Sequence, residues 1–239
     1  MSRLEEKARE TLAKLPVSAL STVMTRLGIR HACMQGVRPA NPDAVRMVGQ
    51  AFTLRYIPAR EDLDTMAAVS RDDALQRVAL EQCPPGDVLV IDARGDARTA
   101  CAGDMFVTRL MQRGCAGIVT DGGLRDVCPI SKLAIPAFLQ APAANPTFVA
   151  HHPADMNVPI GCGGVAVYPG DVLVGDCDGV IVIPFNLLGE VMEGAIAIVE
   201  YDEFVDEQLA QGASLIGLYP ASESSRAAYQ VWREAKSAP

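Results

Sequence analysis

The residues best suited to chemistry lie in two short loops, each of which follows an apolar run. One loop carries Gly103-Asp104, and the other runs from Gly122 to Asp126. The guanidinium of Arg125 can bind a carboxylate through two parallel hydrogen bonds and can stabilise a developing enolate oxygen. Asp126 stands at the expected start of a helix, where capping and the helix dipole also favour a carboxylate. Anion binding and a structural role, such as an ion pair of Arg125 with Asp121 or Asp126, are both open at this point.

Apolar periodicity predicts the elements that hold these loops. A turn leads into an apolar, β-branched run over Gly86–Asp92, and Gly103–Arg113 has the spacing of a helix with an apolar face formed by Met105, Phe106, Leu110 and Met111. A second apolar run over Cys115–Asp121 ends in a sharp turn at Gly122-Gly123. This order of strand, loop, helix and strand places the two loops opposite each other. The helix N-terminus at Gly103 would offer backbone N–H groups to an anion.

The remaining pattern predicts helices at both ends of the chain and further strands between them. Additional strands are expected over residues 47–56, 163–167, 171–175 and 179–183. Additional helices are expected over residues 3–15, 18–27 with Ser18 as N-cap, 72–81, and 186 to about 209. We therefore expect an α/β protein with β/β/α layers, a single domain over 1–239, N-terminal helices within 1–28, and a C-terminal helical arm over 186–220 that embraces a neighbouring subunit.

Composition and charge exclude several classes of protein. The chain has 239 residues, of which 49% are hydrophobic, so it can bury a large core. A formal net charge of -8 argues against a nucleic-acid surface, which needs clustered lysine and arginine. No signal-like segment opens the chain and no apolar run approaches the ~20 residues of a membrane span, so we expect a cytoplasmic protein with no membrane association. Seven scattered cysteines without a C-x-x-C pair indicate neither a disulfide framework nor a zinc site.

Other chemical motifs do not account for the chain. The glycines near Gly95 and Gly103 do not form a dinucleotide-binding fingerprint, no P-loop occurs, and no lysine stands out as a Schiff-base candidate. His151 and His152 suggest a metal site, but no third ligand is in register, and we expect both in a loop. Arg55 and the charged residues 60–64 are expected in a polar loop, either solvated or overhanging a site.

The sequence resembles the RraA-like family, which includes class II pyruvate aldolases acting on 4-hydroxy-4-methyl-2-oxoglutarate and 4-carboxy-4-hydroxy-2-oxoadipate. The resemblance extends from about Gly49 to Pro220, through the segments GDVLV, AGDMF, GIVTDGGLRD, NVPIGCGGVAVYPGDVLVGDCDGVIVIP and GLYP. Its specific part is GGLRD at its distance from AGDM. The resemblance implies a swivelling phosphohistidine-domain-like β/β/α fold.

The resemblance also implies a metal and roles for individual residues. Asp126 would be the single protein ligand of Mg²⁺ or Mn²⁺, which accept hard oxygen ligands and, for Mg²⁺, retain water. Arg125 would bind the pyruvyl group, and Gly103, Asp104, Met105 and Phe106 would bind the substrate carboxylate. Asp104 would in addition position the water that acts as acid and base. Relatives often have Glu-Leu-Leu after this glycine, whereas this chain has Asp-Met-Phe, so the substrate size stays open.

Relatives assemble as a homotrimer or a dimer of trimers, with sites at subunit boundaries. A glutamate from a neighbouring subunit's C-terminal helix would complete each site, and it falls on Glu200 or Glu203, with Glu200 favoured. The implied activity is cleavage of 4-hydroxy-2-oxo acids to pyruvate and a second oxo acid, through an enolate held by the metal and Arg125, with oxaloacetate decarboxylation as a side activity.

Two alternatives to this activity follow from the same resemblance. Some members of the superfamily bind and inhibit ribonuclease E, and they lack the complete Arg-Asp pair that is present here. The enolate machinery could instead serve a decarboxylase or dehydratase of sugar-derived acids, with Arg55, Arg60 or the His151-His152 segment binding the distal group of the substrate.

Overall fold

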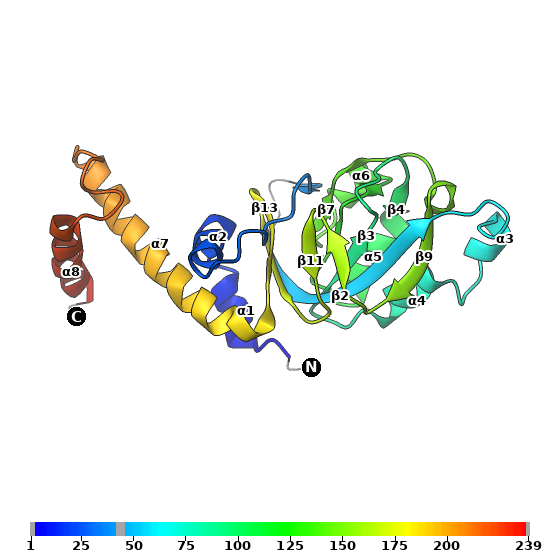
Figure 1. Ribbon diagram of the computed structural model, residues 1–239, viewed down its shortest axis with the longest axis horizontal. Coiled ribbons are helices and arrows are strands. Elements are labelled where there is room, and N and C mark those ends of the chain that lie inside the picture. Colours follow the sequence, from blue (N-terminus) through cyan, green and yellow to red (C-terminus); the bar gives the residue numbers. More distant parts are fainter. Residues whose placement is uncertain (1–2, 42–45, 238–239) are drawn as a thin grey trace.

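The computed structural model describes residues 3–41 and 46–237, and it has a central mixed sheet with helices on its flanks (Figure 1). The strand order of the main sheet is β1-β7-β5-β3-β2-β12-β13, with β9 paired to β2. These strands are β1 Arg38–Pro39, β2 Met47–Pro58, β3 Asp87–Asp92, β5 Gly117–Thr120, β7 Ala137–Leu139, β9 His151–Met156, β12 Val172–Asp176 and β13 Gly179–Ile183. The strands β2, β3, β5 and β7 are parallel, and the other pairings are antiparallel.

Two smaller sheets and the helices complete the body. A three-stranded parallel sheet contains β4 Ala100–Ala102, β6 Gly123–Leu124 and β8 Ala141–Pro142, and a ribbon contains β10 Ile160–Cys162 and β11 Val165–Val167. The helices are α1 Glu6–Leu12, α2 Val17–Arg26, α3 Met66–Val69, α4 Leu75–Gln82, α5 Asp104–Gln112, α6 Val127–Ile130, α7 Leu188–Ala210 and α8 Glu223–Ser237, with 3₁₀ turns η1 Thr147–Val149 and η2 Phe185–Leu187. Within the described residues, no helix is long and apolar enough to cross a membrane.

Alternate residues of the parallel strands supply two separate cores. Leu89 and Ile91 of β3 pack with residues of α4 and α5, such as Leu110. Val88 and Val90 point to the other face and pack with the β10–β11 ribbon, for example with Val167. Because a strand alternates its side chains between its two faces, an uninterrupted apolar run is what a doubly covered strand requires. The predicted β/β/α layering is therefore confirmed.

Several predicted elements differ from the structure in detail. The second helix begins at Val17 with Pro16 in the N-cap position, so Ser18 is not the cap; the fixed φ of proline already suits a helix entry. Met105 does not belong to the buried face of α5, because its side chain is 79% exposed and Val107 is buried with Leu110 instead. The helix expected over 72–81 starts only at Leu75.

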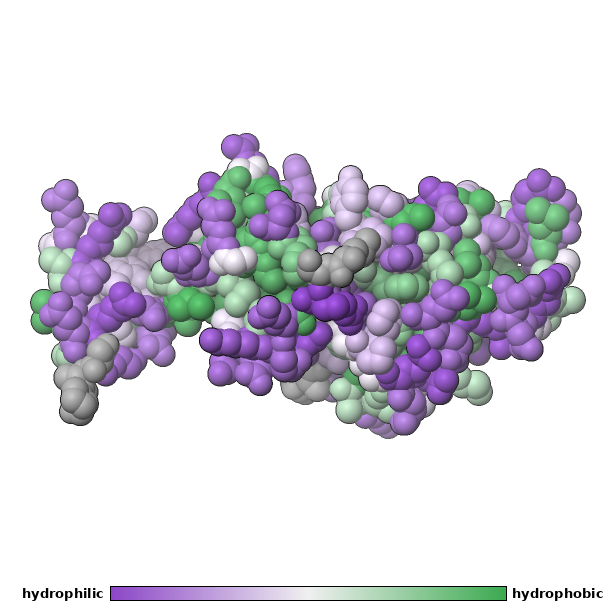
Figure 2. Space-filling model, turned by 90° about the horizontal axis from the view of Figure 1, so that it is seen from below, coloured by the Kyte–Doolittle hydropathy of each residue, from purple (hydrophilic) through white to green (hydrophobic). Residues whose placement is uncertain are grey.

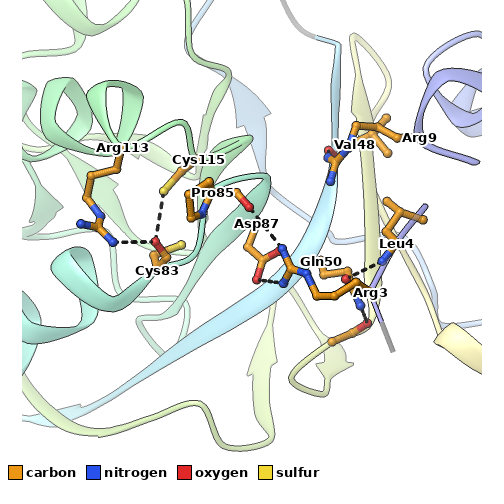
Figure 3. A network of polar contacts seen from close by, with 11 residues as sticks. Arg3, Leu4, Arg9, Val48, Gln50, Cys83, Pro85, Asp87, Arg113 and Cys115 are labelled. Atoms are coloured by element: carbon orange, nitrogen blue, oxygen red, sulfur yellow. Dashed lines mark hydrogen bonds and ion pairs between the residues drawn. The ribbon is translucent and has the colours of Figure 1, made fainter. Parts of the chain in front are cut away.

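The N-terminal helices are tied to the sheet by side chains near its edge (Figure 3). Arg3 pairs with Asp87 at 2.8 Å, where β3 begins, and the backbone N–H of Leu4 donates to Gln50 of β2 at 2.9 Å. The guanidinium of Arg9 donates to the carbonyl of Val48. These contacts fix α1 against the start of the two central strands.

The C-terminal part forms a helical arm that projects away from the sheet (Figure 1). The first half of α7 packs against α2 through Leu188, Val191 and Ala195. Its second half packs with α8 in a separate aromatic cluster of Phe204, Tyr201, Tyr229 and Trp232. The long C-terminal helix is therefore as expected, whereas the assignment of one domain to 1–239 stays a prediction.

Candidate active site

The two loops singled out from the sequence lie side by side at the carboxyl ends of the parallel strands. Each strand of the small sheet continues from a main-sheet strand: β4 follows β3, β6 follows β5, and β8 follows β7. Ala100 of β4 pairs with Gly123 of β6, and Ala102 pairs with Leu124. Ligands of α/β sheets bind outside the carboxyl ends of strands, so this is where a site is expected.

Glycines allow the two loops to approach each other closely. A Cβ atom at Gly103 would lie 2.9 Å from Nε of Arg125 and 2.9 Å from Oδ2 of Asp126. A Cβ atom at Gly123 would lie 2.5 Å from the Cβ of Ala143. The distance at Gly123 is shorter than two carbon atoms tolerate, so the packing against Ala143 requires glycine there. At Gly103, an added Cβ atom would force the side chains of Arg125 and Asp126 to move.

Arg125 and Asp126 form an ion pair at the mouth of this loop pair. Nε of Arg125 donates to Oδ2 of Asp126 at 3.1 Å, and the two side chains are 49% and 40% exposed. The backbone of Asp126 is left-handed, with φ 56° and ψ 38°, and its side chain makes no capping hydrogen bond to α6. The capping explanation for this aspartate is therefore wrong, and strained backbone of this kind is frequent at functional sites.

Asp121 is not the partner of Arg125. Its buried carboxylate accepts backbone N–H groups from Ala93 at 2.7 Å, Gly95 at 3.0 Å and Gly163 at 3.3 Å. Burial raises the pKa of this carboxyl, an effect that the three hydrogen bonds oppose. Asp121 therefore joins three backbone segments beneath the site and belongs to the scaffold.

Arg125 lines a pocket whose volume is about 230 Å³. The N-terminal turn of α5 forms one wall with Gly103, Asp104, Met105 and Phe106, and α3, α4 and the η1 turn form the other wall. We call this space the Arg125 pocket. Drug-sized ligands occupy roughly 300–1,000 Å³, so a metabolite of a few carbon atoms suits it better.

The backbone donors at the N-terminus of α5 are only partly available. The N–H of Met105 donates to the carboxylate of Asp104 at 2.8 Å, and the N–H of Phe106 donates to the carbonyl of Gly103 at 3.1 Å. The N–H of Asp104 has no acceptor within residues 3–41 and 46–237. The first helical N–H is therefore the donor that an anion would meet, together with the positive end of the helix dipole.

Three polar contacts hold β4, which leads into Gly103. The hydroxyl of Tyr56 donates to the carbonyl of Cys101 at 3.3 Å, and the side-chain amide of Gln76 donates to the same carbonyl. Thr147 donates to the carbonyl of Ala100 at 2.7 Å. Burial raises the pKa of the Tyr56 phenol well above its usual value, so it stays a donor. The loop at Gly103 is thus fixed from β2, α4 and η1.

In the described part of the chain, the histidines belong to no metal cluster, and the arginines near residue 60 are paired with aspartates. His151 and His152 lie in β9 and not in a loop, since the strand pairs with β2. His151 stacks on Tyr56 with ring centroids 5.4 Å apart, and burial lowers its pKa; His152 faces Asp64. Among the described residues, no group of three or more His, Cys, Asp or Glu could hold a metal ion. Arg55 and Arg60 are each paired with an aspartate.

Glu200 and Glu203 lie on the projecting half of α7, far from the two loops in Figure 1. Glu200 accepts a hydrogen bond from the hydroxyl of Tyr229 at 3.2 Å and pairs with Arg233 at 3.4 Å. Glu203 pairs with Lys236 at 2.7 Å. A single chain does not bring either glutamate to the Arg125 pocket, so their predicted catalytic role depends on a neighbouring copy and stays a prediction.

Comparison with known proteins supports the resemblance seen in the sequence. The model of the RraA-like family, described as Aldolase/RraA, matches residues 17–182. This chain belongs to the RraA-like family. A protein of Halalkalibacterium halodurans, provisionally assigned as a 4-hydroxy-4-methyl-2-oxoglutarate aldolase, is 36% identical over 165 residues, which are 68% of this chain and 75% of that protein.

Two further relatives carry names that refer to different activities. A 4-hydroxy-4-methyl-2-oxoglutarate aldolase of Thermus thermophilus is 36% identical over 117 residues, which are 48% of this chain and 70% of that one. The crystal structure of Streptomyces coelicolor RraAS2, titled an unusual member of the RNase ES inhibitor RraA protein family, superimposes with a TM-score of 0.76 at 31% identity. It covers 85% of this chain and 98% of its own length. The RraA-like fold expected from the sequence is thus confirmed.

Proposed function

We propose that this RraA-like protein is a divalent-metal-dependent carbon–carbon lyase that cleaves 4-hydroxy-2-oxo acids to pyruvate and a second oxo acid. The aldolase names of its relatives support a lyase. The observation that carries the proposal is the Arg125–Asp126 pair, which packs against Gly103 at the N-terminus of α5. Arg125 lines the Arg125 pocket, and both residues line a neighbouring hollow next to Pro142. This arrangement places a planar cation at a helix N-terminus, with a carboxylate paired to that cation.

The donor set at Asp126 fits Mg²⁺ or Mn²⁺. Its carboxylate is 40% exposed, and no further cluster of acidic, histidine or cysteine ligands surrounds it in the described parts of the chain. A single exposed carboxylate suits a hard cation that fills its remaining positions with water and substrate oxygens. When bound, such a cation supplies Lewis-acid stabilisation of negative charge on the 2-oxo oxygen.

Arg125 and Asp104 would then act on the two sides of the C3–C4 bond that is cleaved. The fork of Arg125 binds the pyruvyl group and stabilises the enolate oxygen as charge develops there. The N–H of Asp104 binds the adjacent carboxylate at the helix N-terminus. The Asp104 carboxylate lies on the same wall of the pocket and can hold the water that accepts the proton of the 4-hydroxyl group.

The cleavage involves no net oxidation or reduction and therefore needs no redox cofactor. The 4-hydroxyl proton is removed, C4 becomes a carbonyl, and the electrons of the C3–C4 bond form the enolate of pyruvate. Protonation at C3 then gives the methyl group of pyruvate. Loss of CO₂ from oxaloacetate gives the same enolate, so oxaloacetate decarboxylation is expected as a side activity.

The enolate can be tested without knowledge of the true substrate. Pyruvate incubated with the protein and Mg²⁺ in D₂O should lose its methyl proton NMR signal, because protonation of the enolate is reversible. Arg125→Lys keeps the charge but loses the planar fork, and it should slow this exchange on the order of 10²–10³-fold. Arg98→Lys is the matched control, since Arg98 is also exposed and paired with a nearby aspartate, Asp96, and it should exchange like the wild type.

Folded wild-type protein that leaves the methyl protons untouched with both Mg²⁺ and Mn²⁺ would overturn the lyase proposal. The second candidate, a regulator that binds a ribonuclease of the E type, is favoured by the similarity to RraAS2. Such a regulator has no reason to catalyse methyl exchange. The exchange experiment therefore separates the two functions.

We also propose that the protein assembles as a homotrimer or a dimer of trimers in which Glu200 completes a neighbour's site. The arm projects from the body, and Leu215 and Ile216 near its tip are 52% and 92% exposed. Leu209 and Tyr219 of the same arm are also exposed, and a group of exposed apolar side chains is typical of an interaction site. If light scattering shows a monomer and that monomer has undiminished activity, this proposal is contradicted.

A further inference from the structure

The Arg125 pocket contains a second cation that the proposed chemistry leaves without a role. Arg77 of α4 lines this pocket together with Gln76 and with the α5 turn. Its side chain is exposed, and its guanidinium makes no hydrogen bond or ion pair with any residue in the described ranges. An arginine of this kind presents a complete planar fork to a ligand.

Neighbouring arginines differ from Arg77 because acidic side chains neutralise them. Each of three arginines in the surrounding helices and loops has its guanidinium on a carboxylate at 2.5 to 2.9 Å; these pairs are Arg60–Asp62, Arg71–Asp73 and Arg109–Glu81. Arg60, which the sequence offers as a candidate for binding the distal group of the substrate, is thereby occupied. Among the described arginines of this region, Arg77 is therefore the one whose guanidinium is available to bind an anion.

The position of Arg77 is well defined relative to the site. The neighbouring side chain, Gln76, donates to the carbonyl of Cys101 in β4, the strand that leads into Gly103. Helix α5 contacts α4 on one side and α6 on the other, and Figure 1 shows α4 and α6 on opposite sides of α5. Arg77 and Arg125 therefore line the same pocket from two different elements, α4 and the loop that leads into α6.

Exposed apolar side chains line the same pocket as this second cation. Met66 and Met105 border the pocket with 62% and 79% exposure, and Leu63 beside α3 is 54% exposed. Figure 2 shows apolar colour within the polar surface at the right-hand end of the molecule, where Figure 1 places α3. An apolar surrounding strengthens the attraction between a guanidinium and a carboxylate, because less water competes for either group.

We propose that Arg77 is a specificity-determining residue that binds a second carboxylate of the substrate, the one beyond the bond that is cleaved. The assignment rests on the proposed lyase activity and deepens it, because it names the side chain that would distinguish 4-hydroxy-2-oxo acids with a distal carboxylate from those without one. The pyruvyl end is held at Arg125, so a charged group at the other end of a short molecule meets Arg77.

The test compares two substrates that differ in the distal carboxylate. 4-Hydroxy-4-methyl-2-oxoglutarate carries it and yields two molecules of pyruvate, whereas 4-hydroxy-2-oxopentanoate lacks it and yields pyruvate and acetaldehyde. In Arg77→Gln, the ratio of kcat/KM for the diacid to that for the monoacid should fall on the order of 10- to 100-fold, mainly through KM of the diacid. Arg77→Lys should recover part of the ratio. Arg71→Gln, which removes an already paired arginine ahead of α4, should leave the ratio at the wild-type value.

The outcomes separate this inference from the activity on which it depends. If the wild type turns over both acids and the ratio in Arg77→Gln matches that of Arg71→Gln, the assignment of Arg77 is wrong while the lyase stands. If the wild type turns over neither acid and shows no methyl exchange of pyruvate, both the lyase proposal and the assignment of Arg77 are wrong. A circular dichroism spectrum of each variant checks that α4 is still formed.

Discussion

The two loops of the candidate site and the helical arm use their charged residues in opposite ways. In the arm, Glu200, Glu203 and Glu207 each receive a hydrogen bond or ion pair from α8, from Tyr229, Lys236 and Trp232. At the site, and within the described residues, the carboxylate of Asp126 is paired only with the neighbouring Arg125, and the guanidinium of Arg77 has no partner. The arm thus uses its polar groups to hold two helices together, whereas the site keeps its polar groups available to a ligand.

This difference predicts that catalysis and stability can be separated by mutation. Exposed ion pairs contribute roughly 0–1 kcal/mol to stability, so removing the Arg125–Asp126 pair costs little folding free energy. The arm also has a buried aromatic cluster around Phe204, which is 2% exposed. Truncation of such a side chain costs several kcal/mol. The following changes are ordered from the largest expected effect on turnover to the smallest.

Asp126→Ala should abolish pyruvate formation, because it removes the only proposed protein ligand of the metal. Alanine is disfavoured in the left-handed conformation of residue 126, so a loss of stability of about 1–2 kcal/mol is expected as well. Asp126→Asn is the matched control for the backbone, since asparagine adopts this conformation readily, and it should lose activity while melting like the wild type. Full turnover of the wild type in excess chelator would refute the metal requirement.

Glu200→Gln should lower turnover on the order of 10²-fold if a neighbour's arm holds the catalytic water, because placement of a proton acceptor contributes about that much. Glu203→Gln is the matched control on the same helix, and it loses only the ion pair to Lys236. Steady-state pyruvate formation by both variants decides the point. A wild-type rate for Glu200→Gln would show that Glu200 serves only to bind α8, and a loss confined to Glu203→Gln would move the role to Glu203.

Phe204→Ala should have the smallest effect on turnover and a large effect on the arm. The loss of its contacts with Tyr201 and Trp232 should loosen α8 at a cost of about 3–5 kcal/mol. A red shift of the fluorescence of Trp232, measured in native protein, would report this. Ile216→Ala, at a position that is 92% exposed, should not shift the emission. A larger loss of turnover than in Glu200→Gln would contradict the separation of arm and site.

The sequence allowed the layers to be predicted but not all of the site. Runs such as Val88 to Ile91 carry the fold, because a strand covered on both faces must be apolar at every position. The strands β6 and β8 contain two residues each, too few to show any period, so the small sheet was missed. Arg77 could not be found either, since its only signal is its position across the pocket from Arg125. Met105 was misplaced because an apolar helical spacing does not show which of its members face the solvent.

The glycine-rich contact between β4, β6 and β8 also bears on how this protein could be redesigned or could diverge. At Gly123 an added side chain would collide with Ala143 and with the backbone of Thr99, and at Gly103 it would displace Arg125 and Asp126, so these two positions tolerate little variation. The opposite wall, with Met66, Ser70 and Arg77 on or near short exposed helices, has no such restriction. New substrate preferences should therefore arise by changes in the segment from residue 63 to 77. A library of variants limited to that segment would sample specificity while it preserves the reaction.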